Sequence, residues 1–326
     1  LANEDVPGHA KLAEAPPAGA TFEEGYGAYY GPDYAPDLMM DACEAWLHEV
    51  APGARSGDEP FFLYLPFVEP HLAMQPPRDL VDSYPAEWDE QPYLGNRGYT
   101  PHPRPRAGYA AMITDLDQHV GDVVALLDEL GLTEDTLVIF SSDNGATHDV
   151  GGVDTTFFDS VGGLRGRKGS VYEGGLRVPM VAAWPGWIEA GSVTDHVSAF
   201  QDVLPTLCDL AGVYDAAGAP TPPPTEGLSF LPTLLGNADE QRRHEHLAWE
   251  FFGYGGQKAV RMGDWKAVRT KTRRDQPGAV ELYDLAADPG ETTDVAAEHP
   301  EVVAYAEALF EQARTTNPTF PQPLYD

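Results

Sequence analysis

The segment Asp143-Asn144-Gly145 combines two oxygen-bearing side chains with a sharp turn, directly after an apolar run at 137–140. Adjacent carboxylate and amide oxygens are the donors that Ca²⁺ or Mg²⁺ prefers. Because Asp-Asn-Gly is also favourable turn chemistry, the tripeptide alone is better explained as a turn that ends a strand. It therefore indicates a candidate half of a metal site, or a simple turn.

A histidine occupies a similar position after another apolar run. His71 follows Pro66 and Pro70, just past the run at 61–65. An imidazole there could donate a proton to a leaving group or bind an anionic ester. A loop histidine hydrogen-bonded to the backbone is the alternative.

Basic residues concentrate in one glycine-rich stretch, although the whole chain has only 20 lysines and arginines. Arg165, Arg167, Lys168 and Arg177 fall between positions 165 and 177. Glycine allows a backbone to approach a ligand closely, so the stretch indicates an anion site. We expect Arg177 to form a structural pair with Glu173, and Lys168 to serve the ligand.

The elements that must position these residues follow from apolar spacing. Runs at 61–65, 136–141 and 178–184 are short, apolar and bounded by turn residues, which predicts buried strands. Spacings of three and four predict helices from Pro36 to Pro52-Gly53 and from Tyr109 to Leu130. This alternation predicts an α/β fold with a mostly parallel sheet covered by helices on both faces. Ligands then bind at the carboxyl ends of the strands.

The pattern changes towards the carboxyl terminus. Runs at 247–252, 257–261, 265–269 and 280–283 are short and turn-bounded, which predicts a small antiparallel sheet. A last helical pattern covers 300–313. We therefore predict a large domain at 1–238 and a small α+β domain at 239–326.

The charge of the chain is strongly negative, with 20 basic and 52 acidic residues and a net charge of −32. Such a surface repels phosphate backbones and anionic membranes, so we expect neither nucleic acid nor a membrane as a partner. No apolar run approaches the length that spans a bilayer.

In combination and in this order, these segments resemble the sulfatase family of the alkaline phosphatase superfamily. The resemblance covers nearly the whole chain from residue 36 onward. It rests on Pro60-Phe61-Phe62-Leu63-Tyr64 with Pro70-His71, Asp143-Asn144-Gly145, Leu164-Arg165-Gly166-Arg167-Lys168-Gly169, Tyr172-Glu173-Gly174-Gly175-Leu176-Arg177-Val178-Pro179, Asp202-Val203-Leu204-Pro205-Thr206-Leu207 and Glu281-Leu282-Tyr283-Asp284-Leu285.

The resemblance implies an alkaline phosphatase-like fold and metal-dependent hydrolysis of a sulfate ester, such as that of a sulfated carbohydrate. Asp143 and Asn144 match two protein ligands of a metal that is usually Ca²⁺, with Mg²⁺ as the alternative. Lys168 matches the lysine that contacts sulfate, and His71 the histidine on the sulfate or leaving-group side. His148 lies where relatives vary their substrate pocket. The family also implies a periplasmic or secreted location in a bacterium.

Other family signatures are missing from these 326 residues. Sulfatases have a strand that ends in two aspartates and a Cys- or Ser-x-Pro-Ser-Arg segment, whose first residue becomes the formylglycine nucleophile. Neither Cys43 nor Cys208 lies in that context; both lie in helical patterns that predict buried free thiols, with a disulfide between them as the alternative. We therefore expect the chain alone to be inactive, or a separate polypeptide to supply the front half.

Two other functions stay open. A phosphodiester or phosphonate monoester hydrolase shares this fold and metal edge. A non-catalytic module that binds sulfated glycans belongs to another class. The retention of His71, Asp143, Asn144 and Lys168 together argues against such a degenerate module.

Overall fold

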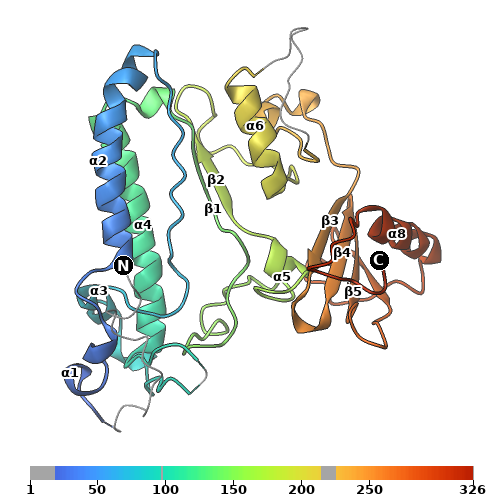
Figure 1. The fold of residues 1–326 in the computed structure, drawn as a ribbon, viewed down its shortest axis with the longest axis horizontal. Helices are drawn as coiled ribbons and strands as arrows, with labels where there is room; N and C mark the ends of the chain where they lie inside the picture. The colour runs from blue at the N-terminus through green and yellow to red at the C-terminus, as the bar shows by residue number, and fades with distance from the viewer. Residues whose placement is uncertain (1–18, 97, 214–224, 326) are drawn as a thin grey trace. The chain divides into compact units, whose positions relative to one another are not determined.

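The computed structural model describes residues 19–96, 98–213 and 225–325, and these residues form two compact units (Figure 1). Unit 1 ends at Thr136 and also includes Thr147–Ser160. Unit 2 consists of Leu137–Ala146 and the chain from Val161 onward. The domain boundary at residue 238 stays a prediction, and the proline cluster at 220–224 lies outside the described residues.

Unit 1 is organised around two long helices that lie side by side, α2 (Ala35–Ser56) and α4 (Pro105–Glu129) (Figure 1). Their apolar faces are buried, with Leu47 and Ala107 completely inaccessible to solvent. Arg55 donates a hydrogen bond to the carbonyl of Leu130 at 3.0 Å. The short elements of this unit are α1 (Phe22–Gly25), η2 (Gly27–Tyr29), α3 (Arg78–Asp82), η3 (Ala86–Trp88) and η4 (Thr133–Asp135).

The ends of the two long helices show whether the glycine and proline residues of the sequence predicted them correctly. Helix α4 is confirmed, and Gly131 follows it with a positive φ of 66°. The predicted end of α2 at Pro52-Gly53 is wrong, because the helix continues to Ser56. Proline removes one backbone hydrogen bond, and the helix absorbs that loss for one further turn. Gly57 then terminates it, with φ of 76° and its N–H bonded to the Ala54 carbonyl at 3.0 Å.

The predicted strand at 61–65 is not a strand in this structure. The segment is irregular, and no residue in the described part of the chain pairs with it in a ladder. Phe62 and Tyr64 are 67% and 75% exposed. A strand requires a neighbour that satisfies its N–H and C=O groups, and apolar composition alone does not supply one.

Unit 2 contains the predicted strands β1 (Val138–Ser141) and β2 (Met180–Ala183). They pair antiparallel, with Val138 opposite Ala183 and Ser141 opposite Met180. One antiparallel pair is compatible with a sheet that is otherwise mostly parallel. The short helical elements here are α5 (Glu173–Leu176), η5 (Phe200–Asp202), α6 (Val203–Leu210), α7 (Leu231–Leu234), η6 (Ala238–Glu240) and η7 (Gly253–Gly255).

The predicted carboxy-terminal sheet is confirmed. Its strands pair antiparallel in the order β3 (Leu247–Phe251), β4 (Gln257–Met262), β5 (Trp265–Thr270) and β6 (Val280–Asp284). Helix α8 (Pro300–Gln312) packs against this sheet and contributes Ala306, Leu309 and Phe310 to its core. In the part of the chain that the structure describes, no helix is long and apolar enough to cross a bilayer.

Candidate functional site

Strand β1 leads directly into the Asp143-Asn144-Gly145 turn. Asn144 Nδ2 donates to the Gly145 carbonyl at 2.9 Å, and Ser142 Oγ donates to the Asn144 carbonyl at 2.9 Å. The exposed Asp143 carboxylate makes no hydrogen bond or ion pair with any residue that the structure describes. The turn is therefore held by Asn144 and Ser142, and the Asp143 carboxylate remains available to solvent or a cation.

Gly145 brings this turn against the basic stretch. Its N–H donates to the Gly175 carbonyl at 3.1 Å, and a Cβ at Gly145 would lie only 1.9 Å from the Gly174 oxygen. The Lys168 N–H donates to the Ala146 carbonyl at 2.8 Å. The predicted metal pair and the predicted sulfate-contacting lysine thus lie on two loops of unit 2 whose backbones touch.

The basic residues of this stretch divide into structural ones and an uncommitted one. The predicted Arg177–Glu173 pair is confirmed at 2.7 Å. The Arg165 guanidinium lies 3.9 Å from the centroid of the Tyr172 ring, which fixes it structurally. The Lys168 ammonium group forms no ion pair or hydrogen bond within the described residues.

A buried ion network holds the Lys168-bearing stretch on the carboxy-terminal sheet. Lys266 Nζ lies 2.8 Å from Glu173 Oε1 and 3.0 Å from Glu291 Oε1, and all three side chains are at most 5% exposed. Burial raises the pKa of Glu173, but Lys266 and Arg177 outweigh burial, so this pKa is lowered overall. For Glu291, burial outweighs Lys266 and the pKa is raised. The network fixes helix α5, and through it the stretch that precedes α5.

Two predicted site residues belong to unit 1. His71 is exposed, and its Nδ1–H donates to the Leu72 carbonyl at 2.5 Å, which leaves Nε2 as the acceptor of the neutral ring. The ring meets the edge of Tyr99, with centroids 6.2 Å apart. His148 is half-buried in the loop at 147–160. The site roles of His71, His148, Asp143, Asn144 and Lys168 stay predictions.

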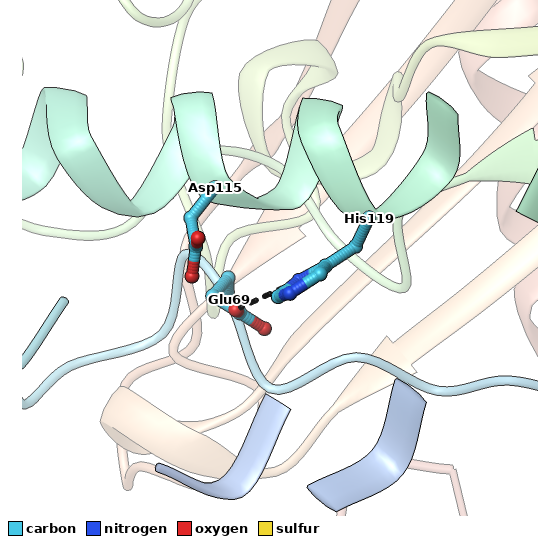
Figure 2. Close-up of side chains that lie close together, drawn as sticks. All are labelled: Glu69, Asp115 and His119. Atoms are coloured by element: carbon cyan, nitrogen blue, oxygen red, sulfur yellow. Dashed lines mark ion pairs between the residues drawn. The ribbon is translucent and has the colours of Figure 1, made fainter. Parts of the chain in front are cut away.

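A cluster that the sequence analysis missed also lies in unit 1. Asp115 and His119 project from α4 towards Glu69 on the neighbouring segment, and one ligand atom of each lies within 4.8 Å of the others (Figure 2). All three residues are buried. The available signal was an Asp and a His four positions apart on the buried face of a predicted helix.

The side-chain oxygens at the turn after β1 are the kind of ligand that Ca²⁺ takes, but they are too few to hold the ion by themselves. Asp143 and Asn144 offer hard oxygens, as Ca²⁺ requires, and the Asp143 carboxylate is uncommitted. Calcium takes about six to eight oxygen ligands, and these two side chains supply only a small part of that set. The donor chemistry of the pair therefore fits such a cation, but two side chains would supply only part of its coordination.

The chain is similar in sequence to proteins named as sulfatases. The sulfatase family model matches residues 8–213, and the model of the N-sulphoglucosamine sulphohydrolase carboxy-terminal region matches residues 166–316. A sulfatase from Formosa agariphila is 32% identical over 82% of this chain and 47% of the relative. The N-acetylgalactosamine-6-O-sulfatase of Bacteroides thetaiotaomicron is 30% identical over 79% of this chain and 48% of its own length. The chain spans about half the length of these relatives.

Structural comparison agrees. The crystal structure of the PsFucS1 sulfatase from Pseudoalteromonas superposes with a TM-score of 0.60 at 23% identity, covering 85% of this chain and 52% of that one. The fold is thus the alkaline phosphatase-like α/β fold with a small antiparallel carboxy-terminal sheet and a helix. The match of the sulfatase family model over residues 8–213 shows that the chain belongs to the sulfatase family.

Proposed function

We propose that this chain is the part of a metal-dependent sulfuric ester hydrolase that carries half of the metal site and the sulfate-contacting lysine. The observation that supports this most directly is the contact between the Asp143-Asn144 turn and the Lys168 stretch, in which the Asp143 carboxylate and the Lys168 ammonium group are both uncommitted. In a chain with a net charge of −32, an anionic ester needs such a local cation.

The chain's own residues have distinct roles in this proposal. Lys168 binds the sulfuryl oxygens and neutralises charge that builds up on them. His71 donates a proton to the leaving oxygen from Nε2 when the ring is protonated at both nitrogens. Asp143 and Asn144 hold part of the coordination of a divalent cation, Ca²⁺ or alternatively Mg²⁺, which supplies further charge neutralisation when bound. His148 contacts the substrate outside the ester group.

We infer that turnover needs residues beyond these 326. Cys43 is only 4% exposed in the middle of α2, and burial raises the pKa of its thiol, which argues against a role as the nucleophile. Cys208 lies on α6 and has no Pro-Ser-Arg after it. Without a covalent nucleophile, only charge stabilisation remains. The exposed aromatic side chains at 62 and 64 support a further segment, on the same or a separate polypeptide, that covers them.

The proposed substrate is a sulfate ester of a carbohydrate. A relative that is 30% identical is named as an N-acetylgalactosamine-6-O-sulfatase. Two alternatives are kept because they share the same loops: hydrolysis of a phosphodiester or phosphonate monoester, and binding of sulfated glycans without turnover. By family, the proposed location is the periplasm or the outside of a bacterial cell, with no nucleic-acid or membrane partner.

The test measures hydrolysis of an aryl sulfate, an aryl phosphonate and sulfated N-acetylgalactosamine, each with Ca²⁺ or Mg²⁺. We expect no turnover by the 326-residue chain alone, and preferential sulfate hydrolysis once the Cys- or Ser-x-Pro-Ser-Arg segment is supplied by its full gene or by a co-expressed polypeptide. Normal turnover by the chain alone would refute the inference that its nucleophile is missing. Faster phosphonate hydrolysis, or glycan binding with no turnover in the completed protein, would establish one of the alternatives instead.

A further inference from the structure

The Glu69, Asp115 and His119 cluster has the composition of a metal site rather than of a helix surface. Asp115 and His119 lie four residues apart on one face of α4, and Glu69 approaches them from the segment that leads to His71 (Figure 2). The Glu69 side chain is 1% exposed and the His119 side chain 9% exposed. Two carboxylates and one imidazole therefore converge in a region that excludes water.

Several buried ligand atoms in this cluster accept or donate no hydrogen bond within the described residues. Glu69 Oε2, Asp115 Oδ2 and His119 Nδ1 are buried and make no hydrogen bond in the described part of the chain. No lysine or arginine among the described residues pairs with Glu69 or Asp115. Burial raises the pKa of both carboxyl groups, because it disfavours their charged forms.

The surroundings orient the imidazole towards the two carboxylates. His119 Nε2 lies 3.5 Å from Asp37 Oδ1, and Nδ1 lies 3.8 Å from Glu69 Oε1. The Phe67 ring stacks on the imidazole with an interplanar angle of 6°. A carboxylate on one ring nitrogen and free ligand atoms on the other is the arrangement that holds metal-binding histidines.

Tyr34 completes the surroundings from the turn before α2. Its hydroxyl donates to Glu69 Oε1 at 3.3 Å. Burial raises the pKa of Tyr34, and Glu69 and Asp115 raise it further, so the phenol stays a neutral donor. Glu69 Oε1 is thereby held by the Tyr34 hydroxyl, while the buried Oε2 makes no hydrogen bond among the described residues.

We propose that Glu69, Asp115 and His119 bind one divalent transition-metal cation of the Zn²⁺ or Mn²⁺ class, with different ligands from the Asp143-Asn144 pair. The imidazole nitrogen favours these ions over Ca²⁺ and Mg²⁺, which prefer oxygen donors alone. In a tetrahedral zinc site with metal–ligand distances of about 2.0–2.1 Å, the ligand atoms lie about 3.4 Å from one another. The ligand atoms here lie within 4.8 Å of one another, so small side-chain rotations bring them to that spacing. The bound ion connects helix α4 to the segment that carries His71, because Glu69 lies two residues before that histidine.

The test titrates the chelator-treated 326-residue chain with Zn²⁺, Mn²⁺, Ca²⁺ or Mg²⁺ alone in a calorimeter. We expect one equivalent of Zn²⁺ or Mn²⁺ to bind and to raise the melting temperature, and Co²⁺ to give the visible absorption of a site with a nitrogen ligand. Asp115→Asn and His119→Gln should each weaken binding at least 10-fold. Asp37→Asn should weaken it about 10-fold through the orientation of His119.

Two variants serve as controls, and circular dichroism checks the fold of each. Asp117→Asn changes an exposed carboxylate of the same helix, and Asp143→Asn changes the turn after β1; both should keep the affinity of the parent chain. Absence of saturable binding, or binding that Asp115→Asn and His119→Gln leave unchanged, would overturn the proposal. Loss of binding in Asp143→Asn alone would overturn it as well, because the ion would then be held at the turn.

Discussion

Buried His102 should make the stability of the fold depend on pH in a way that one substitution can isolate. The residue is 1% exposed, and the backbone N–H of Arg104 donates to its Nδ1 at 3.1 Å. A Cβ at Gly108 would lie 2.6 Å from its Cε1, so the ring packs directly against the glycine of helix α4. Burial, together with the nearby Arg104 charge, lowers the pKa of His102 to about 4.

The sign follows from where the proton binds. An unfolded chain binds a proton at His102 near pH 6.5, whereas the folded chain does so only near pH 4. As pH falls from about 6.5 towards 4, the unfolded state therefore gains protons first and the free energy of unfolding decreases. From pH 7.5 to 5.0 this decrease amounts to about 2 kcal/mol for one such histidine.

The assay compares urea unfolding of the parent chain and of His102→Gln at pH 7.5, 6.0 and 5.0. Glutamine can accept the Arg104 N–H and does not titrate, so the parent chain should lose about 2 kcal/mol more than the variant over this range. Other titrating groups, such as Glu69 and Asp115, are common to both proteins and cancel in the difference. Parallel pH profiles for the two proteins, or an NMR titration of the His102 ring near pH 6.5, would refute the reasoning.

Three further outcomes concern unit 2. Lys266→Met should lower the free energy of unfolding by about 3–5 kcal/mol in urea, because it leaves the buried carboxylates of Glu173 and Glu291 without their shared cation. Gly145→Ala should lower the free energy of unfolding by about 1–3 kcal/mol, because the new Cβ would meet the Gly174 oxygen. The control Gly121→Ala, on the exposed surface of α4, should be neutral or slightly stabilising. Equal effects of the two substitutions would contradict this explanation. Lys168→Ala should leave the melting temperature unchanged but lower sulfate-ester turnover in the completed enzyme, and a large loss of stability would show that the lysine is structural.

Local patterns predicted the elements that are held together by sequence neighbours. Strands β4 and β5 are joined by Met262-Gly263-Asp264, and Gly263 has the positive φ of 62° that such a tight turn needs. Helix α4 has a buried face along most of its length, and its end is marked by Gly131. In both cases the residues that form the element and the residues that end it lie within one short stretch, so spacing and turn chemistry were sufficient.

Elements that depend on distant partners were predicted less well. The run at 61–65 has the composition of a buried strand, but a strand forms only where another strand satisfies its backbone groups. Helix α2 continues past Pro52, although proline usually ends a helix. The hydrogen bond that Pro52 lacks costs less free energy than the helix gains from the turn that follows. The metal pair and Lys168 were proposed from family motifs; their backbone contact through Gly145 and Ala146 is information that only the structure contains.

The cluster around His119 shows why a buried polar site escapes a pattern-based reading. An Asp and a His four positions apart usually form a helix-surface pair, and Glu69 precedes Asp115 by a long loop in the sequence. What distinguishes the three is burial without a lysine or arginine partner among the described residues, which appears only when the segment before His71 packs against α4. Burying two carboxylates in this way is unfavourable, and apolar side chains of similar size would stabilise the fold more. A cation at this position offsets that cost and gives the arrangement a physical reason, which is why the cluster is better explained as a ligand set than as part of the core.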